Sequence, residues 1–186
     1  LRMLAASVGD QVLTKETSLA EALAMLRQHP QVRAELLELL DVLAARIEHV
    51  HPVARIAAEV PLQIHARYTR IEMLAALGVG DVAKPPEWWE GVKWTDHAKT
   101  GICAFTLDKT SGNFSPTTSY KDRAISRDLI RWESQSITGA ESETGRRYRE
   151  HVVRGTQILL FARLRADDRA FWFLGPATYV SHEGER

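Results

Sequence analysis

The apolar pattern of the chain changes in kind at Pro85-Pro86, and this change limits the possible folds more than any other feature. Before it, leucines recur at spacings of three and four residues between charged residues, which is typical of amphipathic helices. After it, short runs rich in β-branched and aromatic residues stand between turn residues, which is typical of strands. The sequence therefore predicts an α+β fold, with an N-terminal helical bundle or connector over residues 1–84 and a mostly antiparallel, β-barrel-like domain over residues 85–186.

The boundaries of the expected elements follow from capping residues and turn residues. Ser18 with Glu21, and Thr69 with Glu72, have the spacing of a capping box, and Gly78 is suited to end a helix. We expect helices at about 18–28, 31–49, 53–59 and 69–77, a short helix after residue 142, turns at 111–113 and 167–168, and strands at 101–107, 122–126, 129–134, 157–165 and 170–180, the last two forming a hairpin.

Composition indicates a globular protein with a hydrophobic core. The chain has 186 residues, of which 45% are hydrophobic and 26% charged, and this length is enough to bury a core without metals or cross-links. Its one cysteine, Cys103, cannot form an internal disulfide. No apolar run approaches a membrane span, and the first residues do not resemble a signal peptide. We therefore expect a cytoplasmic protein with no membrane partner.

The net charge of zero hides a difference between the two halves. Residues 1–90 carry nine Lys and Arg against twelve Asp and Glu, a net of −3, whereas residues 91–186 carry fifteen against twelve, a net of +3. The second half thus favours an anionic partner, although a mixed solvated surface explains a difference of this size equally well.

The motifs of the common enzyme classes are missing. The chain has no phosphate-binding loop, no dinucleotide-binding fingerprint, no zinc-protease motif and no nucleophile elbow. His49, His51 and Cys103 lack the spacing of zinc ligands. We expect no catalytic activity, no metal and no cofactor, and we expect Cys103 to be a small buried side chain.

Aromatic, cationic and small polar residues gather between residues 114 and 151. Nucleic-acid sites use these types, because cations and hydroxyls hold phosphates, aromatic faces stack on bases, and amide or carboxyl groups hydrogen-bond base edges. Each signal has an ordinary alternative: core packing for Trp132 or Tyr120, and an exposed helix end for Arg146-Arg147.

An ordered set of motifs over residues 62–186 resembles one bacterial domain family. That family is the C-terminal domain, formerly of unknown function, of proteins that combine a phospholipase-D-like nuclease with a DEAD/DEAH-type helicase, as in SauUSI-like modification-dependent (type IV) restriction enzymes. The motifs are His65-Ala66-Arg67-Tyr68-Thr69-Arg70-Ile71-Glu72, Leu107-Asp108-Lys109, the run 114–126, Trp132-Glu133-Ser134-Gln135, Thr144-Gly145-Arg146-Arg147-Tyr148, Phe173-Leu174-Gly175-Pro176 and the run 179–184.

The resemblance implies a DNA-recognition module with no catalysis of its own. Its β part would be a compact barrel akin to SET-and-RING-associated (SRA) or pseudouridine-synthase-type (PUA) domains, and a further strand would follow Arg186. Its partners would be DNA, as modified duplex, and the helicase and nuclease domains of the same polypeptide, with a homodimer as a further possibility. The modified base would be 5-methyl- or 5-hydroxymethylcytosine, inspected after flipping out of the stack.

We can assign hypothetical roles on this basis. Trp132 or Tyr120 would stack on the extruded base, Asp122 or Gln135 would hydrogen-bond its Watson–Crick edge, and Ser134 would add a hydroxyl. The Ser134-Gln135 pair is equally well explained as a hydrogen-bond network at a strand end. The flanking phosphates would be held by Lys121, Arg123, Arg146 and Arg147.

Two other classes of function stay open at this stage. In the first, the chain is a structural coupler or dimerisation module between helicase and nuclease, a role that exposed leucines between residues 36 and 47 would favour. In the second, the β part senses a small ligand such as a nucleotide, which the missing phosphate loop disfavours.

Overall fold

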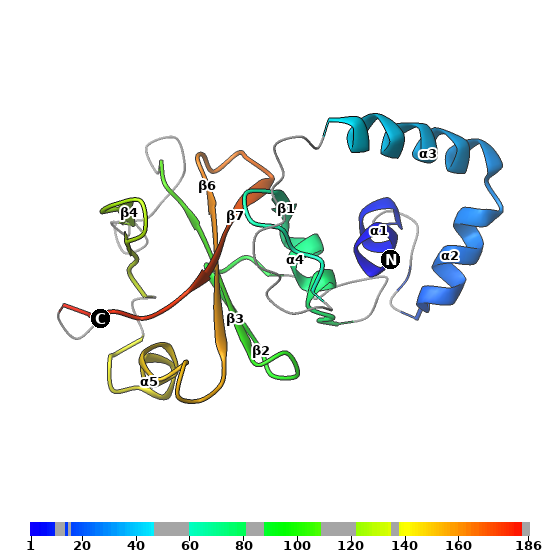
Figure 1. Cartoon of the computed structure of the whole chain (residues 1–186). Helices are drawn as coiled ribbons and strands as arrows, with labels where there is room; N and C mark the ends of the chain where they lie inside the picture. Colours follow the sequence, from blue (N-terminus) through cyan, green and yellow to red (C-terminus); the bar gives the residue numbers. More distant parts are fainter. Residues whose placement is uncertain are drawn as a thin grey trace. The chain divides into compact units, whose positions relative to one another are not determined.

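The computed structural model describes residues 1–9, 14, 16–46, 60–80, 88–108, 122–134 and 138–183. The chain divides into two compact units, Leu1–Trp88 and Trp89–Arg186. The first consists mainly of helices and the second mainly of strands (Figure 1). The predicted α+β class, with helices first and a β domain after them, is therefore confirmed.

The first unit contains four helices and one short strand among its described residues. Their bounds are α1 Arg2–Gly9, α2 Leu19–Arg27, α3 Pro30–Ala45, β1 Arg67–Thr69 and α4 Arg70–Ala76. Helices α1, α2 and α4 pack together and bury Ala6, Ala22, Met73 and Leu74. These three helices form the predicted bundle.

The predicted capping residues of two helix starts and one helix end are confirmed, whereas the helix expected at 31–49 ends at Ala45. The Ser18 backbone N–H donates to the Glu21 carboxylate over 2.8 Å, and the Glu21 N–H donates to the Ser18 hydroxyl over 3.3 Å. Thr69 and Glu72 repeat this reciprocal pattern at the start of α4. At its end, Gly78 has φ 68°, a left-handed conformation that glycine adopts without strain.

Helix α3 departs from the bundle. It begins with Pro30 at its first position, where the missing N–H costs no hydrogen bond. None of its side chains is buried, and among the described residues only α2 makes more than isolated contacts with it. Its exposed apolar residues are Val32, Leu37, Leu39, Leu40, Val42 and Leu43.

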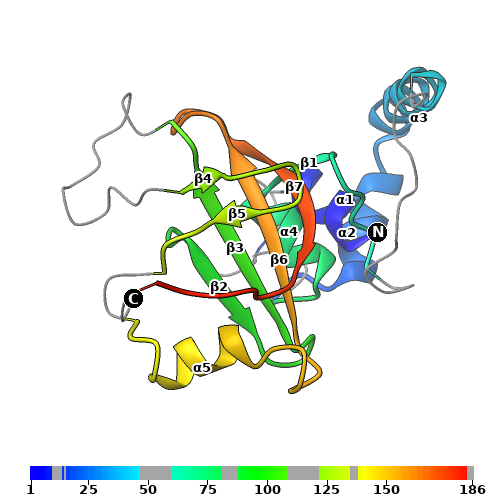
Figure 2. The same ribbon diagram turned by 60° about the vertical axis from the view of Figure 1, so that its left-hand side comes forward.

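The second unit is built on a curled mixed sheet whose strands run in the order β2-β3-β6-β7 (Figure 2). Strands β2 and β3 are antiparallel, β3 and β6 parallel, and β6 and β7 antiparallel. A separate antiparallel pair, β4 with β5, lies apart from this sheet. The bounds are β2 Val92–Thr95, β3 Thr100–Thr106, β4 Arg123–Ala124, β5 Ile130–Arg131, α5 Glu143–Arg149, β6 Gln157–Arg163 and β7 Ala170–Ala177.

The core of this unit centres on β3, in which every residue is buried. A strand buried on both faces reads as a continuous apolar run, and Gly101 to Phe105 is such a run. Ladder partners point to the same side of a sheet, so Ala104, Phe161 and Phe173 share one face. The rings of Phe161 and Phe173 stack there with centroids 4.7 Å apart.

The predicted β6–β7 hairpin is confirmed, but several strands differ in length from the prediction. The strands expected at 122–126 and 129–134 shrink to two residues each, because Ile125 and Ser126 both donate to the Leu129 carbonyl and the chain turns back early. Strand β7 ends at Ala177 instead of residue 180. Helix α1 and strands β1 and β2 were not predicted, whereas the helix expected at 53–59 and the turn at 111–113 lie outside the described residues.

No helix of the described residues is both long and apolar enough to cross a lipid bilayer.

Candidate nucleic-acid interface

The candidate site lies on the sheet face that carries Trp94 and Cys103. Trp94 pairs with Gly101 across the β2–β3 ladder, so its side chain shares a face with Gly101 and Cys103. A Cβ on Gly101 would lie 3.6 Å from the Trp94 ring. This is an ordinary van der Waals distance, so the indole lies next to residue 101 and leaves room for a small side chain there.

Helix α5 packs on this same face, and its start is fixed by close backbone packing. The Ser142 hydroxyl accepts from the Gly145 N–H over 3.1 Å and donates to the Gly139 carbonyl over 2.6 Å. A Cβ on Gly145 would stand only 2.3 Å from the Gly139 carbonyl oxygen. Glycine at this position is therefore a requirement of the packing, and it sets how α5 presents the residues that follow.

Those next residues of α5, Arg147 and Tyr148, complete an aromatic cluster. The Arg147 guanidinium carbon lies 4.4 Å from the centroid of the Trp94 ring, a cation–π contact. The Tyr148 ring meets Trp132 edge to face, with centroids 5.3 Å apart and planes at 90°. We call Trp94, Trp132, Arg147 and Tyr148 the aromatic–arginine cluster.

Buried polar groups lie beside the cluster. Burial, and next the negative charge of Asp122, raise the pKa of the Cys103 thiol to about 12. Burial, and next the neighbouring Cys103, also raise the pKa of Tyr148. Asp122 is itself buried, and one of its oxygens accepts from the Glu133 N–H over 3.0 Å. Cys103, as predicted, is a buried small side chain, and its thiol is protonated at neutral pH.

The structure brings some of the predicted pocket residues together. Asp122 and Trp132 lie at the cluster, and Ser134 is half-buried, with its hydroxyl donating to the Thr138 carbonyl over 3.3 Å. That bond matches the alternative in which Ser134 belongs to a hydrogen-bond network at a strand end. Tyr120 and Gln135 lie outside the described residues.

The predicted phosphate-binding residues have different surroundings. Arg123 is exposed on β4, whereas Arg147 is half-buried against Trp94. Arg146 is exposed and pairs with Glu143 at 3.7 Å. Lys121 lies outside the described residues.

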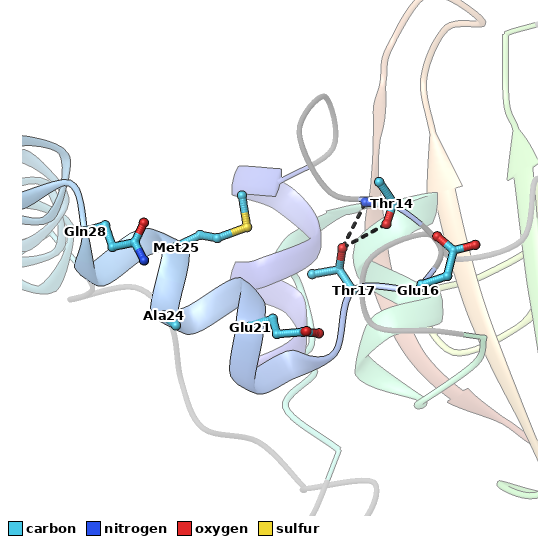
Figure 3. A pocket seen from close by; sticks show the side chains of 7 residues that line it. All are labelled: Thr14, Glu16, Thr17, Glu21, Ala24, Met25 and Gln28. Atoms are coloured by element: carbon cyan, nitrogen blue, oxygen red, sulfur yellow. Dashed lines mark hydrogen bonds between the residues drawn. The ribbon is translucent and has the colours of Figure 1, made fainter.

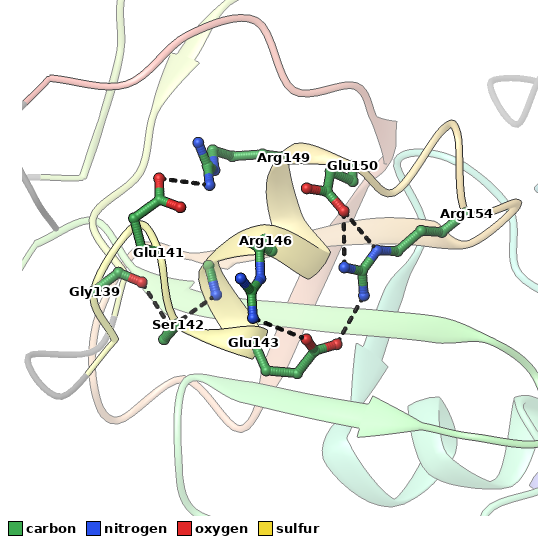
Figure 4. Close-up of polar contacts among 9 residues, drawn as sticks. Gly139, Glu141, Ser142, Glu143, Arg146, Arg149, Glu150 and Arg154 are labelled. Carbon is green, nitrogen blue, oxygen red and sulfur yellow. Dashed lines mark hydrogen bonds and ion pairs between the residues drawn. The ribbon is translucent and has the colours of Figure 1, made fainter.

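Glu143 connects Arg146 to a larger charge network around α5 (Figure 4). It also pairs with Arg154 at 2.7 Å, and Arg154 in turn reaches Glu150 at 2.8 Å. The hydrogen bond from Arg154, followed by its charge, lowers the pKa of Glu143. Much of the positive charge near α5 is therefore already balanced within the unit.

A family described as "Domain of unknown function (DUF3427)" matches residues 62–186. The chain belongs to this family. The match covers the last part of the first unit and the whole of the second. No curated protein matches the chain.

Three residues of this DUF3427 domain that contribute to the site were missed as site residues. Trp94 was missed because the short strand β2 was not predicted. Tyr148 belongs to the motif at residues 144–148, but only its ring contact with Trp132 places it in the site. Trp172 pairs with Ala162 on β6, and Ala162 pairs with Phe105 on β3. Phe105 is two residues from Cys103, so Trp172 shares a sheet face with Cys103, and it is 47% exposed. Strand register identifies Trp94 and Trp172, and the ring contact with Trp132 identifies Tyr148.

His151 holds the segment after β7 in place. It is buried, its Nε2 accepts from the Tyr179 backbone N–H over 3.1 Å, and its Nδ1 faces the Thr156 carbonyl at 3.4 Å. The ring therefore connects the loop after α5 with the segment after β7. This role is structural.

A pocket in the first unit is unsuited to an anion. It is lined by Thr14, Glu16, Thr17, Glu21, Ala24, Met25 and Gln28 (Figure 3). Two carboxylates and no cation line it, and Glu21 is engaged in capping α2. In the described parts of the chain, no group of three or more His, Cys, Asp or Glu side chains is arranged to hold a metal ion.

Proposed function

We propose that the β-rich unit is the DNA-recognition module of a cytoplasmic helicase–nuclease restriction system. It binds duplex DNA that carries 5-methyl- or 5-hydroxymethylcytosine, inspects the base after flipping, and performs no catalysis of its own. The observation that carries this proposal is the aromatic–arginine cluster on one sheet face, beside the buried carboxylate of Asp122.

The chemistry of the cluster suits an extruded cytosine. Flipping costs a few kcal/mol, and stacking on an aromatic side chain returns about 1–3 kcal/mol per base. Trp132 is half-buried, and Trp172 is 47% exposed on the sheet face that it shares with Cys103. A carboxylate can accept from the exocyclic amine of cytosine, and Asp122, whose charge acts on Cys103 on this face, is the carboxylate that we assign to this role.

Discrimination of the modification needs more than one contact. Burying a methyl group contributes only about 0.8 kcal/mol, or roughly a fourfold preference. An apolar wall beside C5 would therefore give a modest preference for 5-methylcytosine, and a larger one requires shape selection or hydrogen bonds. We expect a measured preference of less than about tenfold for a single modified base.

The experiment is fluorescence-anisotropy binding of the full chain to short duplexes that differ only in cytosine, 5-methylcytosine or 5-hydroxymethylcytosine, each at two salt concentrations. Trp132→Ala should abolish the preference for the modified duplex. Trp89→Ala is the matched control, because Trp89 is 79% exposed and lies outside the strands of the sheet. Thermal melts of both variants separate loss of the pocket from loss of the fold.

The double variant Arg146→Glu with Arg147→Glu tests the phosphate contacts. It should weaken binding to all duplexes and flatten the salt dependence. Arg154→Ala is a control for the Glu143 network, since it removes a paired arginine outside the predicted set. Equal binding of modified and unmodified duplexes would reduce the proposal to general DNA binding, and no binding at all would refute it.

The exposed leucines of α3 favour a second function, that of a coupler. Leu39, Leu40 and Leu43 stand at spacings of one and three residues and are each about half exposed. An apolar surface of this kind suits a helix of another domain or a second copy of the chain. Leu40→Asp should lower the mass seen by light scattering, and Ala34→Asp, on a different face of α3, should not; an unchanged mass in both would count against dimerisation.

A further inference from the structure

We propose that the β4–β5 hairpin, residues 123–131, inserts into a groove of the bound duplex beside the extruded base. Ile125 is the apolar wedge at its tip, and Arg123 and Arg127 bind the flanking phosphates. This inference rests on the proposed DNA binding and adds the element that opens the duplex.

The hairpin is a compact structure with a defined tip. Its two strands pair Arg123 with Arg131 and Ala124 with Ile130. The backbone N–H groups of Ile125 and Ser126 both donate to the Leu129 carbonyl, over 2.8 and 3.1 Å. These hydrogen bonds define the backbone of the tip.

The tip exposes a large apolar side chain, that of Ile125, to solvent. Every residue from Arg123 to Leu129 is exposed, and Ile125 is 57% exposed. A two-stranded hairpin is only marginally stable alone, and an isoleucine this exposed contributes little to a core. One exposed apolar residue is ordinary in itself, so the argument depends on what surrounds it.

Positive charge surrounds the isoleucine. Arg123 and Arg127 flank it within two residues on either side, and Asp128 is the one acidic residue between Arg123 and Arg131. Arg131, at the base, pairs with Glu183 at 3.3 Å. An apolar side chain between two exposed arginines matches the groove of a duplex, where phosphates line both sides of the base edges.

The hairpin connects two of the residues that are predicted to contact the base. Asp122 immediately precedes β4 and Trp132 immediately follows β5, and the Glu133 N–H donates to Asp122 across the hairpin base over 3.0 Å. Strands β4 and β5 thus carry Asp122 and Trp132 at one end of the hairpin and the exposed Ile125 at the other. A base drawn toward Trp132 would leave a gap in the stack within reach of the tip.

This arrangement supplies what base extrusion requires. Architectural and base-flipping proteins fill or open a base step with an apolar side chain and recover the unstacking cost through added contacts. A wedge acts only where bases are stacked in a duplex. The proposal therefore commits to double-stranded DNA, and single-stranded DNA should bind without help from Ile125.

The test compares Ile125→Ser with Leu164→Ser in the full chain. Leu164 is a close control, because it is 56% exposed and also lies between two arginines, Arg163 and Arg165, in the β6–β7 connection. The probe is a duplex with one 5-methylcytosine and a neighbouring 2-aminopurine, whose fluorescence rises when it loses its stacking partner. Ile125→Ser should lose most of this rise and bind the duplex about tenfold more weakly, while Leu164→Ser matches the parent.

A second variant tests the arginines. Arg123→Ala with Arg127→Ala should reduce the slope of log affinity against log salt by about 1.8, since each phosphate contact contributes about 0.9. Arg123 and Arg127 are both exposed, so thermal melts of this double variant should be unchanged.

Binding of the corresponding single strand should be unaffected by Ile125→Ser.

The outcomes separate the two proposals. If the parent chain binds and extrudes the base but Ile125→Ser behaves like Leu164→Ser, the hairpin inference is overturned and the recognition proposal stands. If the parent chain binds none of the duplexes, both proposals fall together.

Discussion

Replacing Gly145 by alanine probes the packing that positions the aromatic–arginine cluster. The added Cβ would lie 2.3 Å from the Gly139 carbonyl oxygen, 2.6 Å from that of Ala140 and 2.9 Å from the Ala140 carbonyl carbon. All three are backbone atoms, so no side-chain rotation can relieve the contact. Helix α5 has to move away from residues 139–140, and Arg147 and Tyr148 move with it.

The size of the effect can be worked from these contacts. Overpacking costs about 1–3 kcal/mol, and three backbone atoms inside 3 Å place this site at the upper end. Alanine regains up to about 1 kcal/mol over glycine in a helix. The net loss in the free energy of unfolding is therefore about 2 kcal/mol, which lowers the melting temperature of a unit this size by roughly 8–16 °C.

The assay is thermal and urea unfolding of the full chain, followed by circular dichroism and tryptophan fluorescence. Gly101→Ala is the matched control, because its Cβ would meet the Trp94 ring at an ordinary 3.6 Å. A variant Gly145→Ala as stable as the parent, or a Gly101→Ala variant equally destabilised, would refute the steric argument.

Three further predictions concern single side chains. His151→Leu removes the acceptor of the Tyr179 N–H and should speed hydrogen exchange of that amide, since an unpaired donor costs about 1–3 kcal/mol; unchanged exchange would contradict the contact. Cys103, buried and with its pKa raised to about 12, should react with Ellman's reagent at pH 7 only after denaturation, and fast labelling of the native chain would disprove its burial. The pKa of Glu143 is lowered by Arg154, so its stabilising contribution is present above its unfolded pKa of about 4.3 and is lost as the pH falls through the folded value. Glu143→Gln should therefore flatten the decline in melting temperature below about pH 4.5, and an identical decline would show that the pair contributes nothing measurable.

Local signals predicted the elements that depend on neighbours in the chain. Ser18 and Thr69 cap their helices because the Glu three residues later lies within hydrogen-bond reach in any helix that starts there. The apolar run at Gly101 to Phe105 predicted a strand because burial on both faces needs such a run. Short strands such as β1 and β2 carry too few residues for a periodic pattern, and they were missed.

The candidate site was only partly predictable. Arg146, Arg147 and Trp132 stand out in the sequence as cations and an aromatic close together. Their partners do not, because Trp94 is 53 residues from Arg147 and meets it only through the β2–β3 register. The engagement of Arg146 with Glu143 also depends on the α5 geometry that places the two residues one helical turn apart.

The sequence by itself determined that one half is helical and the other β-rich, where the longer strands β3, β6 and β7 form, and which residues cap α2 and α4, since these follow from hydrogen bonds and apolar spacing within a few residues. Tertiary structure decided that β3 pairs in parallel with β6, that α3 leaves its leucines exposed, and that Ile125 stands at the tip of a hairpin rooted at Asp122 and Trp132. These are contacts between distant segments, and their free energy depends on register and burial that no short stretch of sequence contains.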